Sequence, residues 1–331
     1  MDKNKKIISL GVGSVLLLAL FFLLIRVNPT DKLFQVKKGD SFHSVAQRLA
    51  GEKIIRSRLL FVSLVKISFQ SRNLRTGYYR FKGIKTIPGL IQSLTKGDVA
   101  SRSFTIPEGF NIFQIADILA NKGIVEKQKF LTLCKSKEIL DKFNIKQDTV
   151  EGFLYPDTYY VPYGIPADKL VEIMIANFYD HINARYLGKL KEKYGSVEKG
   201  IIIASLVEWE AVIDFERPLI AGVLLNRLKK NLNLQSCATV QYALNDHKSR
   251  LLFKDLKVRS PYNTYLYKGL PPTPICNPSE KSVLAVIYPS KNNYLFFVSM
   301  QNGRHYFSSS YSQHLKGYKY YILGEKDIDL F

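Results

Sequence analysis

The sequence predicts an α+β protein built from an N-terminal apolar helix, small strand–helix modules and a mixed C-terminal domain. Three observations predict this. Residues 7–25 are uninterruptedly apolar, residues 36–55 and 106–125 match at a constant offset, and the last third of the chain mixes helical and alternating patterns. A chain of 331 residues, 46% of them hydrophobic, is long enough for two or three domains with real cores.

The N-terminal stretch, IISLGVGSVLLLALFFLLI, is uncharged. As a helix it would span roughly 28 Å, close to the hydrocarbon core of a bilayer. It is too long for a typical signal-peptide apolar region, and no A-x-A-like cleavage site follows it. A buried core helix is the alternative, but no polar residue interrupts the stretch to give an amphipathic face. We therefore expect an uncleaved transmembrane anchor at residues 7–26.

The charges beside this anchor predict its orientation. Lys3, Lys5 and Lys6 precede it, and Arg26 alone follows closely. The positive-inside rule then makes residues 1–6 a cytoplasmic tail. We expect a single-pass protein of the inner (cytoplasmic) membrane whose remaining residues are periplasmic or otherwise extracytoplasmic.

The net charge indicates the class of partner, and the cysteine spacing bears on metal sites and disulfides. The formal net charge of +20 favours a polyanionic partner or surface, and the apolar N-terminus argues against nucleic acid. Cys134, Cys237 and Cys276 are widely spaced and form no C-x-x-C pair, so neither a zinc site nor a disulfide framework is indicated. In an oxidising compartment, two of the three cysteines could form one disulfide and leave one free thiol.

The internal repeat describes two related modules. Each copy predicts a strand, a glycine turn and a helix, and each is followed by an aromatic strand, a proline-containing turn and another helix. Two β-α-α-β-α units would thus fill most of residues 34–180. The matched pairs are Val36/Ile106, Gly39/Gly109, Val45/Ile115, Ala46/Ala116, Leu49/Leu119, Ala50/Ala120 and Ile54/Ile124.

Modules of this kind resemble LysM domains, which bind the N-acetylglucosamine backbone of peptidoglycan and chitin. The alternative is that strand–glycine–helix is a generic packing pattern. The expected division is a LysM-like subdomain at 34–104 and a second domain at 105–331, with a second LysM-like repeat within 105–180.

The C-terminal half predicts the remaining elements. A charged helix is expected over 177–194, and two helices over 200–231 that separate near 214–218. The Pro- and Asn-rich residues 260–278 predict a long loop, which inside a compact domain is usually functional. Two strands should surround a turn at Asn302–Gly303, before a final helix that ends near Leu323.

Few kinds of chemistry fit the residues present. The chain has no H-E-x-x-H, no G-x-S-x-G, no P-loop and no dinucleotide fingerprint, and His305 and His314 lack the spacing of a metal pair. We expect no cofactor and no metal. Acid/base chemistry on a carboxylate remains.

The stretch ASLVEWEAV, residues 204–212, holds two carboxylates in an apolar helical run. The helical neighbours of Glu208 are Ala204, Ser205, Ala211 and Val212, all small and uncharged. Desolvation there would raise the pKa of Glu208 and keep it protonated, as a general acid requires. Glu210 lies one turn before Asp214 and is expected to support the turn that follows. A structural role for Glu208 is the alternative.

Six ordered segments resemble one family. EGFLYPDTYYV, ASLVEWEA, ERPLIAGVLLNRL, LQSCATVQYAL, SPYNTYLYKGLPPTPICNPS and YLFFVSMQNGRHYFSSSYSQH are similar, in order and spacing, to segments of the endolytic murein transglycosylases, the MltG or YceG-like proteins. The likeness covers nearly the whole chain.

The resemblance implies a lytic transglycosylase, a lyase that cleaves the β-1,4 bond between N-acetylmuramic acid and N-acetylglucosamine within nascent glycan strands and leaves 1,6-anhydro ends, so ending strand elongation. It maps the catalytic residue to Glu208. It implies peptidoglycan strands as substrate and inner-membrane lipid as surroundings, with peptidoglycan synthases or divisome and elongasome proteins as candidate partners. The expected substrate-binding residues are Asn226, Arg227, Gln235, Thr239, Tyr262, Asn263, Tyr265 and His305.

The chain departs from the family pattern at three places. Where the family has Q-[ST]-D-P-T-V, Cys237 and Ala238 replace Asp and Pro; Trp209 and Ala211 stand within the family's K-E-T; and Gln313 precedes His314. Two alternatives stay open: a membrane-anchored peptidoglycan-binding scaffold whose catalytic domain has decayed, and a muramidase that uses water.

Overall fold

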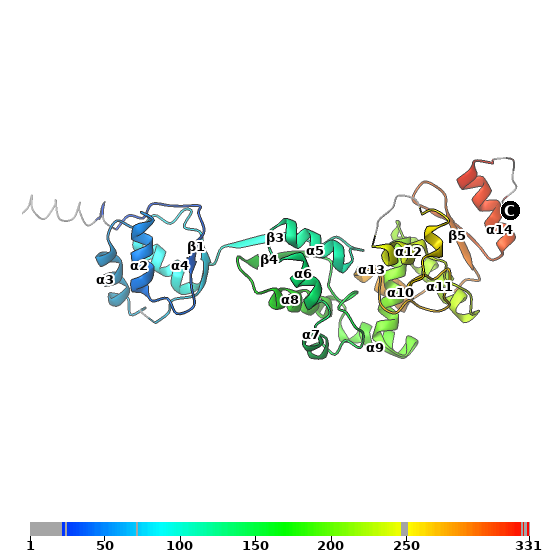
Figure 1. Ribbon diagram of the computed structural model, residues 1–331, viewed down its shortest axis with the longest axis horizontal. Coiled ribbons are helices and arrows are strands. Elements are labelled where there is room, and N and C mark those ends of the chain that lie inside the picture. Colours follow the sequence, from blue (N-terminus) through cyan, green and yellow to red (C-terminus); the bar gives the residue numbers. More distant parts are fainter. Residues whose placement is uncertain are drawn as a thin grey trace, which may run out of the picture. The chain divides into compact units, whose positions relative to one another are not determined.

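The computed structural model describes residues 22, 23, 25–70, 72–245, 251–325, 327 and 330. Within these residues, no helix is both long and apolar enough to cross a membrane. The anchor predicted at 7–26 lies almost entirely outside the described residues. The chain divides into two compact units: one of residues up to 103 together with Tyr160–Ile165, the other of Phe104–Tyr159 and Pro166–Phe331. Figure 1 shows their helices and strands.

The first unit contains a β-α-α-β-α arrangement. Its elements are β1 (Phe34–Val36), α2 (Phe42–Gly51), α3 (Arg58–Ile67), β2 (Gly77–Tyr79) and α4 (Ile87–Lys96). β1 pairs antiparallel with β2, Phe34 opposite Tyr79, and the buried faces of the three helices pack around the pair (Figure 1). The core is rich in aromatic rings, among them Phe34, Phe61 and Phe81, all of which are fully buried or nearly so.

The second unit begins with the same order of elements, with one added helix. β3 (Ser101–Thr105), α5 (Ile112–Asn121) and α6 (Lys127–Leu133) are followed by α7 (Lys137–Lys142), β4 (Thr158–Pro162) and α8 (Ala167–His181). β3 pairs with β4, and both strands continue from one unit into the other. The order of elements therefore agrees with the repeat found in the sequence.

Local chemistry explains why the repeat folds alike. Gly39 and Gly109, at matched positions, have φ of 89° and 76°, which L side chains rarely adopt. Ser41 and Asn111 then cap α2 and α5, each in a reciprocal pair of hydrogen bonds with the residue three positions on.

The rest of the second unit is a mixed helical and two-stranded domain. It contains α9 (Ala184–Tyr194), α10 (Val197–Glu210), α11 (Arg217–Lys229), α12 (Cys237–Leu244), α13 (Glu280–Ile287), β5 (Phe296–Ser299), β6 (His305–Ser308) and α14 (Tyr311–Tyr318), with short turns η1 (Asp214–Glu216), η2 (Asp255–Lys257) and η3 (Lys319–Leu323). α10 is packed against α9, α11, α12 and α13, so it lies at the centre of this domain.

Most of the C-terminal expectations are confirmed. β5 and β6 form the antiparallel hairpin around Asn302–Gly303, the helices split at η1, and the final helical segment ends at Leu323. No helix or strand interrupts residues 260–278. The single helix predicted over 177–194 is wrong. The first helix ends at His181, and Asn183 caps a new helix by accepting hydrogen bonds from the backbone N–H groups of Arg185 and Tyr186.

Candidate active site

α10 carries both carboxylates that the sequence singles out and directs them to different surroundings. Two residues correspond to about 200° around an α-helix. Glu208 contacts the starts of α11 and α13, whereas Glu210, the last residue of α10, contacts the segment that leads into α12.

Both carboxylate oxygens of Glu208 are occupied. Oε1 lies 3.0 Å from Nη1 of Arg217, and Oε2 accepts hydrogen bonds from the backbone N–H (2.9 Å) and the hydroxyl (2.6 Å) of Ser279. Glu208 and Arg217 are both buried, with 9% and 6% of their surface exposed. Because Arg217 begins α11 and Ser279 precedes α13, this ion pair joins three helices.

The expectation of an uncharged environment for Glu208 is wrong. Its neighbours along the helix are small and uncharged, as predicted, but the guanidinium of Arg217 arrives from the next helix. Spacing along one helix does not reveal such a partner. One ion pair and two hydrogen bonds hold Glu208, which fits the structural alternative, and its catalytic role stays a prediction.

Glu210 lines a pocket of about 460 Å³. The pocket lies between the end of α10, α11, the segment before α12, β5 and the C-terminal helix. Its lining consists of Glu210, Val223, Leu224, Arg227, Leu234, Gln235, Ser236, Cys237, Tyr265, Leu295, Phe296, Phe297, Val298, Ser299, His305, His314 and Tyr318. Aromatic rings and hydrogen-bonding groups of this kind suit a carbohydrate, because sugars present both apolar faces and hydroxyls.

The surroundings of Glu210 favour its protonated form. Its Oε1 accepts a hydrogen bond of 2.6 Å from the hydroxyl of Ser236. Burial raises the pKa of the Glu210 carboxyl, although the hydrogen bond from Ser236 and the nearby His305 oppose the rise. A carboxyl group that holds its proton closer to neutral pH, inside a pocket, has what a general acid needs.

Four of the predicted substrate-binding residues meet in this pocket: Arg227, Gln235, Tyr265 and His305. Nη2 of Arg227 donates to Oε1 of Gln235 at 2.5 Å, and the guanidinium lies over the ring of Phe296. The hydroxyl of Tyr265 is 3.1 Å from the sulfur of Cys237, the residue that replaces the family's Asp.

The other four, Asn226, Thr239, Tyr262 and Asn263, do not line this pocket. Asn226 donates to the carbonyl oxygens of Asn292 and Tyr294, and Asn263 donates to those of Leu256 and Val258. The hydroxyl of Thr239 bonds to Ser236 and Thr264, and that of Tyr262 to Thr273. In the structure these polar groups hold loops in place, because a backbone that forms no helix or strand needs side-chain partners.

His305 is held by a residue that the sequence did not single out for the site. Its Nδ1 lies 2.7 Å from Oε2 of Glu216, and its backbone N–H donates to Oε1 of the same carboxylate. Glu216 is 2% exposed. The ring nitrogen left for a ligand is therefore Nε2. Glu216 is the last residue of η1, the break between α10 and α11, and a charged residue at such a break is the signal that could have pointed to it.

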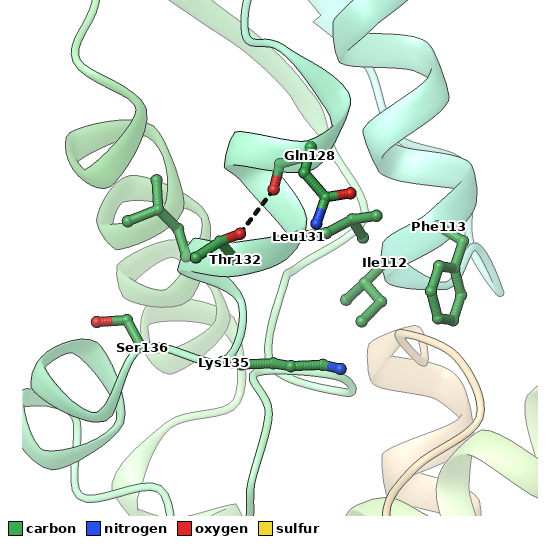
Figure 2. A pocket seen from close by; sticks show the side chains of 8 residues that line it. Ile112, Phe113, Gln128, Leu131, Thr132, Lys135 and Ser136 are labelled. Atoms are coloured by element: carbon green, nitrogen blue, oxygen red, sulfur yellow. Dashed lines mark hydrogen bonds between the residues drawn. The ribbon is translucent and has the colours of Figure 1, made fainter.

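A separate hollow of about 640 Å³ lies beside α5 and α6 (Figure 2). Figure 2 shows Ile112 and Phe113 on one side, and Gln128, Leu131 and Thr132 of α6 with Lys135 and Ser136 on the other. None of its lining residues is an acid, so this hollow does not supply a proton donor for glycoside cleavage.

Among the described residues, no group of three or more His, Cys, Asp or Glu side chains is arranged to hold a metal ion. The pocket around Glu210 places one carboxyl group, whose pKa burial raises, among aromatic and hydrogen-bonding side chains, an arrangement that suits acid/base chemistry. The chain belongs to the YceG-like family, whose family model matches residues 34–319.

Two relatives and one solved structure agree with this placement. The chain is 32% identical over 311 residues to an endolytic murein transglycosylase of Bacillus subtilis strain 168, covering 88% of this chain and 85% of the relative. It is 26% identical over 311 residues to one of Streptococcus pneumoniae strain D39, covering 84% of this chain and 56% of that relative. A crystal structure of a yceG-like protein of Listeria monocytogenes is 32% identical, with a TM-score of 0.61, covering 86% of this chain and 98% of the other.

Proposed function

We propose that this chain is an endolytic murein transglycosylase, the name carried by both relatives. It cleaves the β-1,4 bond between N-acetylmuramic acid and N-acetylglucosamine within glycan strands, leaves a 1,6-anhydro end and thereby ends strand elongation. The observation that carries the proposal is Glu210, a carboxyl with a raised pKa in a pocket lined by Arg227, Gln235, Tyr265 and His305.

Glu210 replaces Glu208 as the proposed acid. A general acid must reach the glycosidic oxygen, and Glu210 lines the pocket whereas both oxygens of Glu208 are bound by Arg217 and Ser279. The environment of Glu210 combines a pocket with burial that raises the pKa of its carboxyl group.

One carboxyl is sufficient for this reaction. Glu210 donates its proton to the glycosidic oxygen as the C1–O bond breaks, and the released chain leaves as an alcohol. The resulting carboxylate takes the proton of the muramic acid C6 hydroxyl, whose oxygen forms the new bond to C1. The intramolecular hydroxyl replaces the water and the second carboxylate of ordinary glycosidases, and Glu210 is protonated again at the end.

The pocket residues would orient the sugars. Nε2 of His305 is available for a hydroxyl or acetamido group, since Nδ1 is held by Glu216. Tyr265 and Phe297 offer ring faces and edges, and Arg227 offers a positive charge near the carboxylates of the murein peptides.

The N-terminal part belongs to the same proposal. The order β1, α2, α3, β2 supports a LysM-like subdomain that holds peptidoglycan, and the net charge of +20 supports a polyanionic surface as partner. The uncharged residues 7–25, with three lysines before them, support an anchor in the inner membrane that places the enzyme outside the cytoplasm. Peptidoglycan synthases and divisome or elongasome proteins are the partners such a position would offer.

Product analysis tests this function. The full chain in detergent is incubated with murein sacculi, and the soluble fragments are analysed by mass spectrometry. Anhydro ends are expected. Reducing ends would identify a water-using muramidase, and binding without fragments a scaffold whose catalytic domain has decayed; either result would overturn the proposal.

A further inference from the structure

α3 is more apolar than its packing in the first unit requires. Seven of its ten residues, RLLFVSLVKI, are apolar, but only Phe61 and Val65 are fully buried. Leu59 is 79% exposed and Ile67 is 71% exposed. Ser63, one turn from both, is exposed between them. Large apolar side chains exposed on one element indicate an interaction surface.

Phe69 extends this face beyond the end of α3. Its side chain is 93% exposed, and its φ of 55° is uncommon for a bulky residue. Leu59 and Ile67 are eight residues apart, two steps of four, so they lie on one side of the helix. We call Leu59, Ile67 and Phe69 the outer face of α3, because they are the large apolar side chains of this segment that are mostly exposed.

A groove continues the outer face toward α4. Its volume is about 420 Å³, and Leu64, Ile67, Pro88 and Ile91 are among its lining residues. The outer face therefore adjoins a groove that can hold an apolar group.

The basic residues in and near α3 favour an anionic partner for the outer face. Between Lys53 and Gly97 the chain has ten Lys and Arg residues and no Asp or Glu. Arg58 and Lys66 belong to α3 itself, and both are exposed. Apolar side chains flanked by basic ones match a lipid surface with anionic headgroups, where each basic residue contributes about 1 kcal/mol of attraction.

The path of the chain brings this face to a membrane. Val27 pairs with Ile55, three residues before α3, and Arg26 pairs with Thr86. The proposed anchor ends at Arg26, so α3 begins close to where the chain would leave the bilayer. We infer that the outer face of α3 rests on the anionic headgroup layer and inserts Leu59, Ile67 and Phe69 into it. This inference rests on the proposed anchor and is independent of the proposed reaction.

Tryptophan quenching tests the inference. Trp209 is the only tryptophan of the chain, so Phe69→Trp adds a single second reporter. Tyr160→Trp is the matched control, because Tyr160 is an aromatic residue of the same unit that is 77% exposed and lies on β4. Each full chain is reconstituted in vesicles that contain phosphatidylglycerol with brominated or unbrominated acyl chains.

Bromine should reduce the added emission of Phe69→Trp about twofold, because an inserted residue lies within the upper acyl region, and should leave Tyr160→Trp unchanged. Replacing phosphatidylglycerol with phosphatidylcholine should weaken the quenching. Equal quenching of the two variants would overturn the inference, as would a Phe69→Trp response to murein sacculi and none to vesicles. Murein cleavage is measured in the same samples, so quenching without anhydro products would contradict only the proposed function.

Discussion

The hydroxyl of Ser236 donates a hydrogen bond of 2.6 Å to Oε1 of Glu210 and links the start of α12 to the end of α10. Ser236 is 4% exposed, and the hydroxyl of Thr264 fixes its backbone N–H at 3.1 Å. The long loop that contains Thr264 thus helps to position the proposed acid, although it contributes few side chains to the pocket.

Replacing Ser236 should shift the pH dependence of the reaction. The hydrogen bond lowers the pKa of Glu210, so Ser236→Ala should raise that pKa further. Activity requires the protonated acid and falls as pH rises through its pKa, so the descending limb of kcat/KM should move to higher pH by about one unit. The pH profile of anhydro-product formation measures this, and a shift to lower pH would contradict the assignment.

The pair of Glu208 and Arg217 should matter chiefly for stability. Removing Glu208 leaves the buried guanidinium of Arg217 with the exposed Asp214 as its remaining ion-pair partner, which costs up to about 3–5 kcal/mol. Urea unfolding should show a loss of this size for Glu208→Gln. Lys281→Ala is the control, because the ion pair of Lys281 with Asp214 is exposed and should contribute little. Equal, small effects of both substitutions would argue against a structural role for Glu208.

Glu216 should act through His305. Glu216→Gln weakens the charge-assisted hydrogen bond to Nδ1, which is worth about 1.5–3 kcal/mol, so kcat/KM should fall about tenfold or more. His305→Ala should lose activity as well, and the double variant should be little worse than His305→Ala alone. Full additivity of the two losses would show that Glu216 does not work through His305.

Glu151 should make the stability of the fold depend on pH. It is buried, and burial raises its pKa to about 8 despite hydrogen bonds from Ile112, Tyr242 and Asn277. Its folded pKa lies above its unfolded value of about 4.5, so the native state holds a proton that the unfolded state has lost. Stability should therefore fall as pH rises from 6 to 8, by at most about 1.4 kcal/mol per pH unit from this group.

Urea unfolding at pH 6, 7 and 8 checks the effect of Glu151. The Glu151→Gln variant has no group to titrate at this position, so its stability should change less over the same range. Parallel pH dependences of the variant and the unchanged chain would rule out Glu151 as the source.

The sequence predicted the elements better than the site. Periodicity and turn residues identified the Asn302–Gly303 hairpin, and the helix break at η1, because these depend on local spacing. Motif membership singled out Arg227, Gln235, Tyr265 and His305, which line one pocket, and their role in substrate binding stays a prediction.

The features of the site that the sequence did not predict depend on contacts between residues far apart in the chain. The environment of Glu208 was not predicted because Arg217 and Ser279 reach it from other elements, and its catalytic role stays a prediction. Asn226 and Asn263 donate to loop carbonyls that no motif reveals. Glu210 was expected to support a turn, yet the fold opens a pocket beside it. Two carboxylates two residues apart cannot be assigned to a pocket from helical spacing alone, since each faces a different set of elements.

Product analysis of Glu210→Gln and Glu208→Gln, each first shown to be folded by circular dichroism, tests the central claim most directly. Both purified chains are incubated with murein sacculi, and anhydro ends are counted by mass spectrometry. We expect Glu210→Gln to form none and folded Glu208→Gln to retain cleavage. Anhydro ends from Glu210→Gln, together with their absence from folded Glu208→Gln, would contradict the account.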